Sequence, residues 1–533
     1  MTDGPAPGAQ QDVVDSTEDR LLVLGGPGTG KTRTALLLAD RILEQERPGR
    51  ARRVLFLTFS KAAVSELFER APTLMTGARV DRVEVSTFHG FACAILNGFG
   101  RYSGRGTAPV TIASEAEEKL RVAAPGSLVY DAIVPAAVEV LNVDWIRERI
   151  AGRYAAIICD EYQDTGDDQD QMLELLADGR RLICLADPNQ MIYDFRADVG
   201  PRRLADLRAK HPREIPLEPA SHRDPSGLIP ALAEALRARR TNDAAVVQAL
   251  DEGRLLIAHS TDTWTDAVEN IRSLRHAGHQ SIGVFVSKRE FVEDLARHLV
   301  DAGIQHEIAG LDAAAGEAQA TLAAMANFAA GEGDFGEVRQ RLAVFLTAAQ
   351  AKKNPPAVAV LLLTTPTALP APIQRHLAEL ETALRGAAGG TISDFFAIGA
   401  RALSIFGWGH SLWRLGVRDL YGQSLRVARR PLDQETAAVL SAVAASRRSD
   451  ALTSDLGFRR MPTRIMTMHQ AKGREMDAVL IVHHPDDYIP NALSHSRVTF
   501  VAVSRARCMV AIQVPVTPHA LYAPIAALID PAF

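Results

Sequence analysis

Leu21-Leu-Val-Leu-Gly-Gly-Pro-Gly-Thr-Gly-Lys-Thr32 is the stretch that decides the fold, and 33–43 continues it with apolar residues at helical spacing. The four apolar residues 21–24 predict a short, buried parallel strand. The glycines that follow let backbone N–H groups surround a phosphate chain, and the N-terminus of the next helix favours negative charge. The order strand, G-x-x-x-x-G-K-T, helix therefore predicts a nucleotide-binding loop in an α/β fold.

The residue types in this loop indicate ATP and Mg²⁺ as cofactors. Lys31 should reach the β- and γ-phosphates, and the Thr32 hydroxyl should help to hold Mg²⁺. A chance glycine-rich turn is the alternative, but it does not explain the correct flanking elements. The loop positions expected to surround the nucleotide are Gly25, Gly26, Pro27, Gly28, Thr29, Gly30, Lys31, Thr32 and Arg33. The loop predicts nucleotide binding and leaves open how the energy is used.

Two further apolar runs end in polar residues that suit the same site. The run 154–159 is followed by Asp160-Glu-Tyr-Gln-Asp164, and the run 181–186 by Asp187-Pro-Asn-Gln190. Ligand chemistry in open α/β sheets lies at the carboxyl ends of parallel strands. We expect Asp160 to bind Mg²⁺ through water, Glu161 to orient or deprotonate the attacking water, and Gln190 to sense the γ-phosphate. A solvated acidic loop is the alternative for 160–164.

Composition limits the class of protein without deciding its function. The 533 residues are 47% hydrophobic and 23% charged, which is ordinary for a soluble protein of about three or four domains. No apolar stretch is long enough to span a membrane, and the polar N-terminus is no signal peptide. Four widely spaced cysteines suit a reduced, cytoplasmic protein. The net charge of −5 gives no support to a nucleic-acid partner, although such a partner needs only a local basic groove.

The chain resembles the UvrD/Rep-type DNA helicases of superfamily 1 in an ordered set of motifs. Residues 160–164 resemble the family's D-E-x-Q-D motif, and the other matching segments follow the family order. These segments are Leu57-Thr-Phe-Ser-Lys-Ala-Ala63, Ser86-Thr-Phe-His-Gly90, Asp187-Pro-Asn-Gln-Met-Ile-Tyr-Asp-Phe-Arg196, His222-Arg223, Met466-Thr-Met-His-Gln-Ala-Lys-Gly-Arg-Glu475 and Phe500-Val-Ala-Val-Ser-Arg-Ala506.

This resemblance implies that ATP lies between two RecA-like domains. Arg223 and Arg505 of the second domain should then reach the γ-phosphate, a task that suits an always-charged planar donor. The family's adenine-reading glutamine corresponds to Gln10, or to Gln11 if the register slips by one. Glu475 resembles the ribose contact. The departures from the family pattern include His222, which replaces a stacking tyrosine, and also Lys61 and Arg474.

The resemblance also implies a channel for single-stranded DNA. Aromatic rings that stack on bases and donors that contact phosphates give a grip independent of sequence. The expected stacking residues are Phe59, His89, Tyr193 and Phe195, and the expected phosphate contacts are Thr87 and Arg196. Ordinary core packing is the alternative for each aromatic residue.

The motif order divides the chain into two RecA-like P-loop domains with parallel sheets, each interrupted by a largely helical accessory insertion. We expect the first domain at 1–90 and 151–218, with a short insertion at 91–150. We expect the second at 219–310 and 459–533, with an alanine- and leucine-rich insertion at 311–458. The short stretch after Ala506 predicts no fused nuclease.

Three functions fit these features to different extents. The leading hypothesis is an ATP-dependent translocase and helicase that moves 3′→5′ on single-stranded or tailed duplex DNA; the resemblance supplies the polarity. The alternative is a DNA-sensing ATPase subunit that works with a nuclease partner, as in Gabija-type phage-defence pairs. A small-molecule kinase would share the phosphate loop but would not explain the late arginines or the aromatic motifs.

Overall fold

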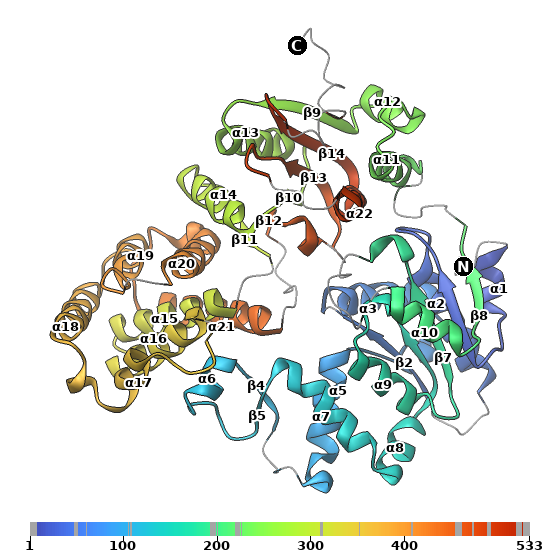
Figure 1. Ribbon diagram of the computed structural model, residues 1–533, viewed down its shortest axis with the longest axis horizontal. Coiled ribbons are helices and arrows are strands. Elements are labelled where there is room, and N and C mark those ends of the chain that lie inside the picture. The colour runs from blue at the N-terminus through green and yellow to red at the C-terminus, as the bar shows by residue number, and fades with distance from the viewer. Residues whose placement is uncertain are drawn as a thin grey trace.

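The computed structural model contains two six-stranded parallel sheets, which lie one above the other (Figure 1). The structure describes residues 8–46, 52–59, 61–104, 106, 109–191, 199, 201–218, 224, 226–309, 313–350, 352–406, 409–453, 461–471, 474–487, 492–518 and 525. Among these residues, no helix combines the length and the apolar character needed to cross a bilayer.

The first sheet has the strand order β3-β2-β6-β7-β1-β8. Its strands are β1 (Arg20–Leu24), β2 (Arg53–Thr58), β3 (Val83–Thr87), β6 (Tyr154–Cys159), β7 (Arg181–Ala186) and β8 (Arg213–Pro216). Its helices are α1 (Ala9–Val14), α2 (Lys31–Gln45), α3 (Lys61–Leu74), α4 (Gly77–Val80), α9 (Asp167–Leu176) and α10 (Pro201–Ala209), with 3-10 turns η2 (Tyr162–Asp164) and η3 (Pro188–Gln190).

Both faces of this sheet are buried, which explains its continuous apolar runs. In β1, Leu22 packs into one core while Leu21 and Val23 pack into the core on the opposite face. Successive side chains of a strand point to opposite faces, so a strand covered on both sides needs apolar residues at every position.

The second sheet has the order β11-β12-β10-β13-β14-β9. Its strands are β9 (Leu255–Ser260), β10 (Ile282–Val286), β11 (Glu307–Ile308), β12 (Thr463–Thr467), β13 (Met476–Val482) and β14 (Ala506–Pro515). Its helices are α11 (Leu228–Arg237), α12 (Ala244–Asp251), α13 (Thr263–His276), α14 (Arg289–Asp301) and α22 (Ala492–Val503), with the 3-10 turn η6 (Met468–Ala471). The strands β11 and β12 are neighbours in the sheet but far apart in the chain. The chain leaves the sheet after β11 and returns to it at β12.

The segment between β11 and β12 is helical, as its composition predicts. Its helices α15 (Ala313–Ala329), α16 (Phe335–Gln350), α17 (Ala357–Thr364), α18 (Ala371–Gly386), α19 (Ile392–Arg401), α20 (His410–Ser424) and α21 (Gln434–Thr453) are joined by 3-10 turns η4 (Pro366–Ala368) and η5 (Leu425–Val427). They surround a core of their own that includes Leu322, Phe345 and Trp413. Among the described residues of this segment, the backbone forms only an isolated bridge, between Thr391 and Pro431, and no strand.

The segment between β3 and β6 is smaller and differs in one respect from our expectation. It contains α5 (Phe88–Phe99), η1 (Gly100–Ser103), β4 (Thr111–Ala113), α6 (Glu115–Lys119), β5 (Ser127–Val129), α7 (Tyr130–Leu141) and α8 (Asp144–Ala151). The parallel pair β4–β5 was not predicted, because strands of three residues leave no periodic pattern.

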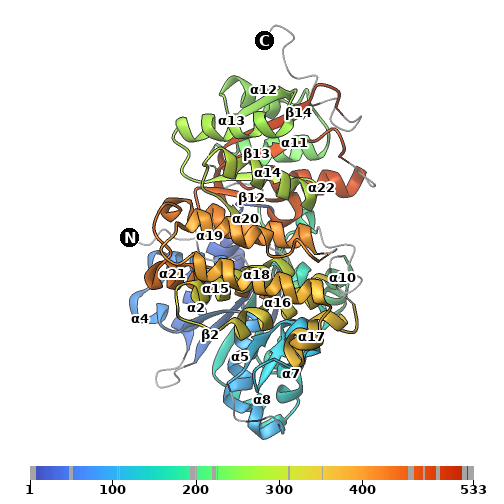
Figure 2. The ribbon, with the colours of Figure 1, turned by 90° about the vertical axis from the view of Figure 1, so that its left-hand side faces the viewer.

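The two inserted segments touch each other beside the sheets. Glu117 of α6 accepts a hydrogen bond from Arg341 of α16 at 2.9 Å and pairs with Arg448 of α21 at 2.6 Å. Figure 2 shows the yellow and orange helices of the larger insertion from the side, between the second sheet above and the first insertion below. The predicted α/β class with two parallel-sheet domains is confirmed, whereas the domain limits given above stay a prediction.

Candidate nucleotide site and domain interface

The loop between β1 and α2 has a backbone that only glycine adopts easily. Gly28 has φ 76° and Gly30 φ 84°, both in the left-handed region. Gly25 is also tightly surrounded, because a Cβ atom there would lie 2.5 Å from the Thr29 Oγ1 atom. The loop therefore needs its glycines to fold back above the start of α2.

Lys31 is the first residue of α2 and points back into the loop. Its Nζ donates to the carbonyl oxygens of Gly25 and Gly26 at 2.5 and 3.1 Å, and its side chain is buried. A buried ammonium held by neutral carbonyls can exchange them for phosphate oxygens, which are stronger acceptors. Thr32 and Arg33 follow it on the first turn of α2, the end of a helix that favours anions.

Asp160 is a buried carboxylate at the end of β6, in the electrostatic field of Lys31. Burial and the neighbouring Glu161 raise the pKa of Asp160 to about 7, although Lys31 acts in the opposite direction. A carboxylate in this position would be stabilised in its charged form by a divalent cation. Mg²⁺ at nucleotide sites is usually held by one or two protein oxygens together with phosphates and water. Asp160 with Thr32 fits that requirement.

Glu161 stands at a turn immediately after β6. Its φ is 53°, a left-handed conformation that is uncommon for residues other than glycine and occurs often at functional sites. Its carboxylate accepts a hydrogen bond from Nε2 of Gln163, which is fully buried. The Oε1 atom of Gln163 in turn accepts the backbone N–H of Asp187 at 3.1 Å.

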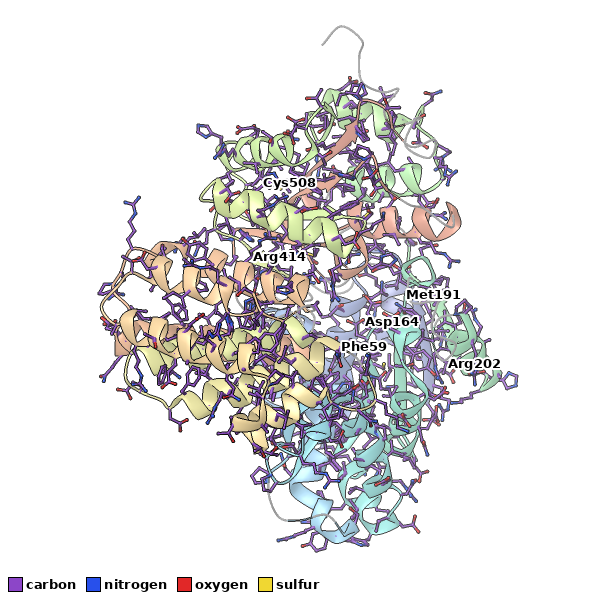
Figure 3. The ribbon with its side chains drawn as sticks, turned by 60° about the vertical axis from the view of Figure 1, so that its left-hand side comes forward. Phe59, Asp164, Met191, Arg202, Arg414 and Cys508 are labelled. Atoms are coloured by element: carbon purple, nitrogen blue, oxygen red, sulfur yellow. The ribbon has the colours of Figure 1, made fainter. Side chains whose placement is uncertain are left out.

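Gln190 joins the two sheets. Its Nε2 donates to Oδ2 of Asp187 at 2.7 Å, and its Oε1 accepts from Nη2 of Arg505 at 3.1 Å. Arg505 follows α22, which belongs to the second sheet, and both side chains are buried. An arginine of one sheet thus lies at the strand ends of the other. Figure 3 labels Phe59, Asp164 and Met191 on the first sheet's side of this boundary.

Two family models match the segments that build this site. The model of the UvrD/REP helicase N-terminal domain matches residues 7–132 and 111–200, and that of the UvrD-like helicase C-terminal domain matches 437–514. Together they cover about half of the chain. The chain belongs to the UvrD/REP helicase family.

Individual relatives of this family match shorter segments. The exonuclease/helicase subunit RexA of Lactococcus lactis subsp. cremoris (strain MG1363) is 47% identical over 74 residues, 13% of this chain and 6% of that protein. The ATP-dependent DNA helicase PcrA of Leuconostoc citreum is 37% identical over 97 residues, 18% of this chain and 13% of the relative. PcrA of Bacillus subtilis (strain 168) is 36% identical over 89 residues, 16% and 12% of the two chains. The chain thus spans only a small part of these relatives.

The residues that the UvrD/REP resemblance assigns to the base and ribose lie on opposite sides of the sheet boundary. Gln10 on α1 is buried and donates from Nε2 to the carbonyl oxygen of Thr29 in the phosphate loop at 3.1 Å. Glu475, which precedes β13, accepts two hydrogen bonds from Arg507 at 3.0 and 2.8 Å. A ribose contact by Glu475 would share its carboxylate with Arg507. His222 and Arg223 lie outside the described residues.

The aromatic residues expected in the DNA channel occur as ring pairs. Phe59 packs against Phe88 with ring centroids 5.1 Å apart. His89 lies flat on Tyr130 of α7, with centroids 3.6 Å apart and an interplanar angle of 13°. Burial lowers the pKa of His89 to about 4, so that its ring is neutral near pH 7. Tyr193, Phe195 and Arg196 fall outside the described residues.

Thr87 caps the helix that carries His89. Its Oγ1 accepts the backbone N–H of Gly90 at 3.0 Å, at the N-terminus of α5. The end of this helix is electrostatically suited to a phosphate beside Thr87.

Sequence reasoning missed two residues of this site. Tyr130 carries no motif and lies in an insertion, so its place against His89 depends on the packing of α7 on α5. Gln163 stands inside the quoted acidic segment, but its two hydrogen bonds depend on the turn at Glu161 and on the neighbouring end of β7.

Proposed function

We propose that the chain is an ATP-driven translocase and helicase that moves 3′→5′ on single-stranded DNA. The observation that carries the proposal is the hydrogen bond between Gln190 and Arg505, because it places an arginine of the second sheet at the nucleotide-loop end of the first. Family membership supports the same function, and the polarity follows from the resemblance alone.

Each residue of the site has a task in ATP hydrolysis. Lys31 would exchange the loop carbonyls for phosphate oxygens, and Arg505 would bring a second fixed charge to the γ-phosphate from the other sheet. Glu161 would accept a proton from the attacking water. Bound Mg²⁺, held by Thr32 and Asp160, would neutralise charge on the phosphates.

Hydrolysis becomes movement through the contact between the sheets. Arg505 gains a charged partner while a γ-phosphate is present, so ATP favours the closed arrangement more than ADP does. A change in the closed population moves the sheets relative to each other. The partly exposed rings of Phe59, His89 and Tyr130 would then offer stacking surfaces to successive bases.

Strand displacement tests this function. Purified protein should unwind a duplex with a 3′ tail in the presence of ATP and Mg²⁺, and should leave 5′-tailed and blunt duplexes paired. Lys31→Ala is the control for nucleotide dependence. Unwinding of the 5′-tailed duplex but not of the 3′-tailed one would contradict the polarity. A rate of ATP turnover that is the same with and without DNA would contradict a DNA motor.

A second candidate function is a DNA-sensing ATPase that acts beside a nuclease partner. The similarity to RexA favours it, because that relative is named as an exonuclease/helicase subunit. In this case the purified chain would hydrolyse ATP on DNA but unwind little. Unwinding at full rate by the chain alone, with no increase when the product of a neighbouring gene is added, would count against this second function.

A further inference from the structure

A continuous series of hydrogen bonds joins Glu161 to the second sheet. It runs from the Glu161 carboxylate to Gln163, from Gln163 to the backbone N–H of Asp187, from the Asp187 carboxylate to Gln190, and from Gln190 to Arg505. The three bonds beyond Gln163 measure 3.1, 2.7 and 3.1 Å. The series crosses from η2 to the end of β7, through η3 and over the boundary to the residues that follow α22.

The residues of this series beyond Glu161 are deeply buried. Gln163 and Asp187 are 0% exposed, and Gln190 and Arg505 are both 3% exposed. Water therefore does not compete for these hydrogen bonds, and losing one partner costs more than at the surface. A buried network of this kind holds its members in one arrangement.

Gln163 is the member that touches the expected general base. One amide group uses both of its ends: the nitrogen donates to Glu161 and the oxygen accepts from Asp187. A primary amide supplies a donor and an acceptor at fixed separation, which neither a carboxylate nor an apolar side chain of the same length supplies. The amide thus orients one carboxylate oxygen of Glu161 relative to the end of β7.

We infer that Gln163 is a positioning residue that ties the Glu161 carboxylate to the Asp187–Gln190–Arg505 contact, so that the general base is held in place while the two sheets are closed. The inference rests on the proposed function, since it assigns Glu161 to ATP hydrolysis. It adds a physical route by which the approach of the second sheet reaches the base itself. When the two sheets separate, Arg505 moves away from Gln190, and the series of hydrogen bonds loses its contact with the second sheet.

Two substitutions of Gln163 separate positioning from general stability. Gln163→Glu keeps the length and the oxygen acceptor for Asp187 but loses the N–H donor to Glu161. Gln163→Met keeps a similar length without adding charge, and it lacks both the donor and the acceptor. Gln169→Glu is the matched control, because the Oε1 atom of Gln169 accepts the Gly166 N–H at the start of α9 and a carboxylate can do the same.

The readouts are DNA-stimulated ATP turnover, binding of a fluorescent ATP analogue, and the melting temperature. Both Gln163 variants should lose about tenfold to a hundredfold in kcat, the range expected of a displaced general base, with the analogue bound within about twofold of wild type. The Gln169→Glu control should match wild type. Both variants lack the N–H donor to Glu161, but only Gln163→Met also lacks the acceptor for Asp187. An equal loss of kcat in the two variants would therefore identify the missing donor as the cause.

A double-mutant comparison tests the connection to the second sheet. Gln163→Glu combined with Arg505→Lys should lose less than the product of the single losses, because both act on one series of hydrogen bonds. Losses that multiply would overturn the coupling. If Gln163→Glu had the same kcat as the wild type, the positioning role would be overturned. The DNA-stimulated turnover of the wild type would still uphold the proposed function in that case. No turnover by the wild type would overturn both together.

Discussion

Asp160 and Glu161 are adjacent in the chain, yet the fold gives them different surroundings. Asp160 continues the line of β6 and is buried in the field of Lys31, while the left-handed backbone of Glu161 directs it to Gln163. One carboxylate therefore suits a cation and the other suits a water molecule. Two carboxylates with separated environments are a common way to divide metal binding from proton transfer.

The division predicts the outcome of Glu161→Gln. The variant keeps the shape of the side chain but cannot accept a proton, so ATP turnover should fall by about a hundredfold or more. Binding of ATP and of single-stranded DNA should persist, as filter binding can show. Asp168→Asn, an exposed carboxylate on α9, is the control and should turn over like wild type. Turnover retained by Glu161→Gln would mean that another group accepts the proton.

His89 predicts a pH dependence of stability. Its pKa is lowered by burial to about 4 in the folded protein, below the ordinary value of 6.5. Between these values the unfolded chain binds a proton that the folded chain does not, so stability falls as the pH drops from about 6.5 towards 4. His89→Phe removes this titration, and its melting temperature should fall less than that of wild type between pH 7 and pH 5. The exposed His276→Gln control should follow wild type. An unchanged pH dependence in His89→Phe would contradict this account.

At the scale of elements, α5 links the first sheet to the insertion that holds Tyr130. Thr87 caps this helix through its Oγ1, so Thr87→Ala should destabilise the protein by about 1 kcal/mol, whereas Thr87→Ser should retain the cap. Chemical denaturation measures both. If Thr87 also contacts phosphate, Thr87→Ala should weaken single-strand binding more than Thr87→Ser. Equal stability of the two variants would show that the cap contributes nothing.

The main strands could be predicted because two-sided burial leaves an apolar run in the sequence. Residues 21–24, 154–159 and 181–186 each ended in a polar segment, and the structure places these ends around Lys31 and Gln190. The helical character of the larger insertion followed from its alanine and leucine content. The strands β4 and β5 did not, since three residues paired across an insertion carry no pattern of their own.

Contacts between distant elements could not be predicted from local patterns. Tyr130 meets His89 only because α7 packs on α5, and Arg507 meets Glu475 only because β13 and β14 are neighbours. The motif resemblance places single residues, whereas the partners of each residue depend on the packing of whole elements. The pairings of Gln163 and Arg505 are of the same kind.

At the scale of the whole molecule, catalysis depends on two sheets that contribute to one site. Arg505→Ala removes the charge that the second sheet brings to Gln190. Turnover should fall by about a thousandfold or more, as for other arginines that complete a phosphoryl-transfer site, while ATP binding persists. Arg272→Ala, on the exposed face of α13, is the control. Undiminished turnover in Arg505→Ala would show that the first sheet hydrolyses ATP without the second.

The central claim is that DNA controls ATP hydrolysis through the closing of these two sheets. Steady-state ATP turnover, measured with and without single-stranded DNA, tests it most directly. We predict that single-stranded DNA raises kcat at least about tenfold in the wild type, and that neither Glu161→Gln nor Arg505→Ala responds to it. A turnover rate that is the same with and without DNA would contradict the account.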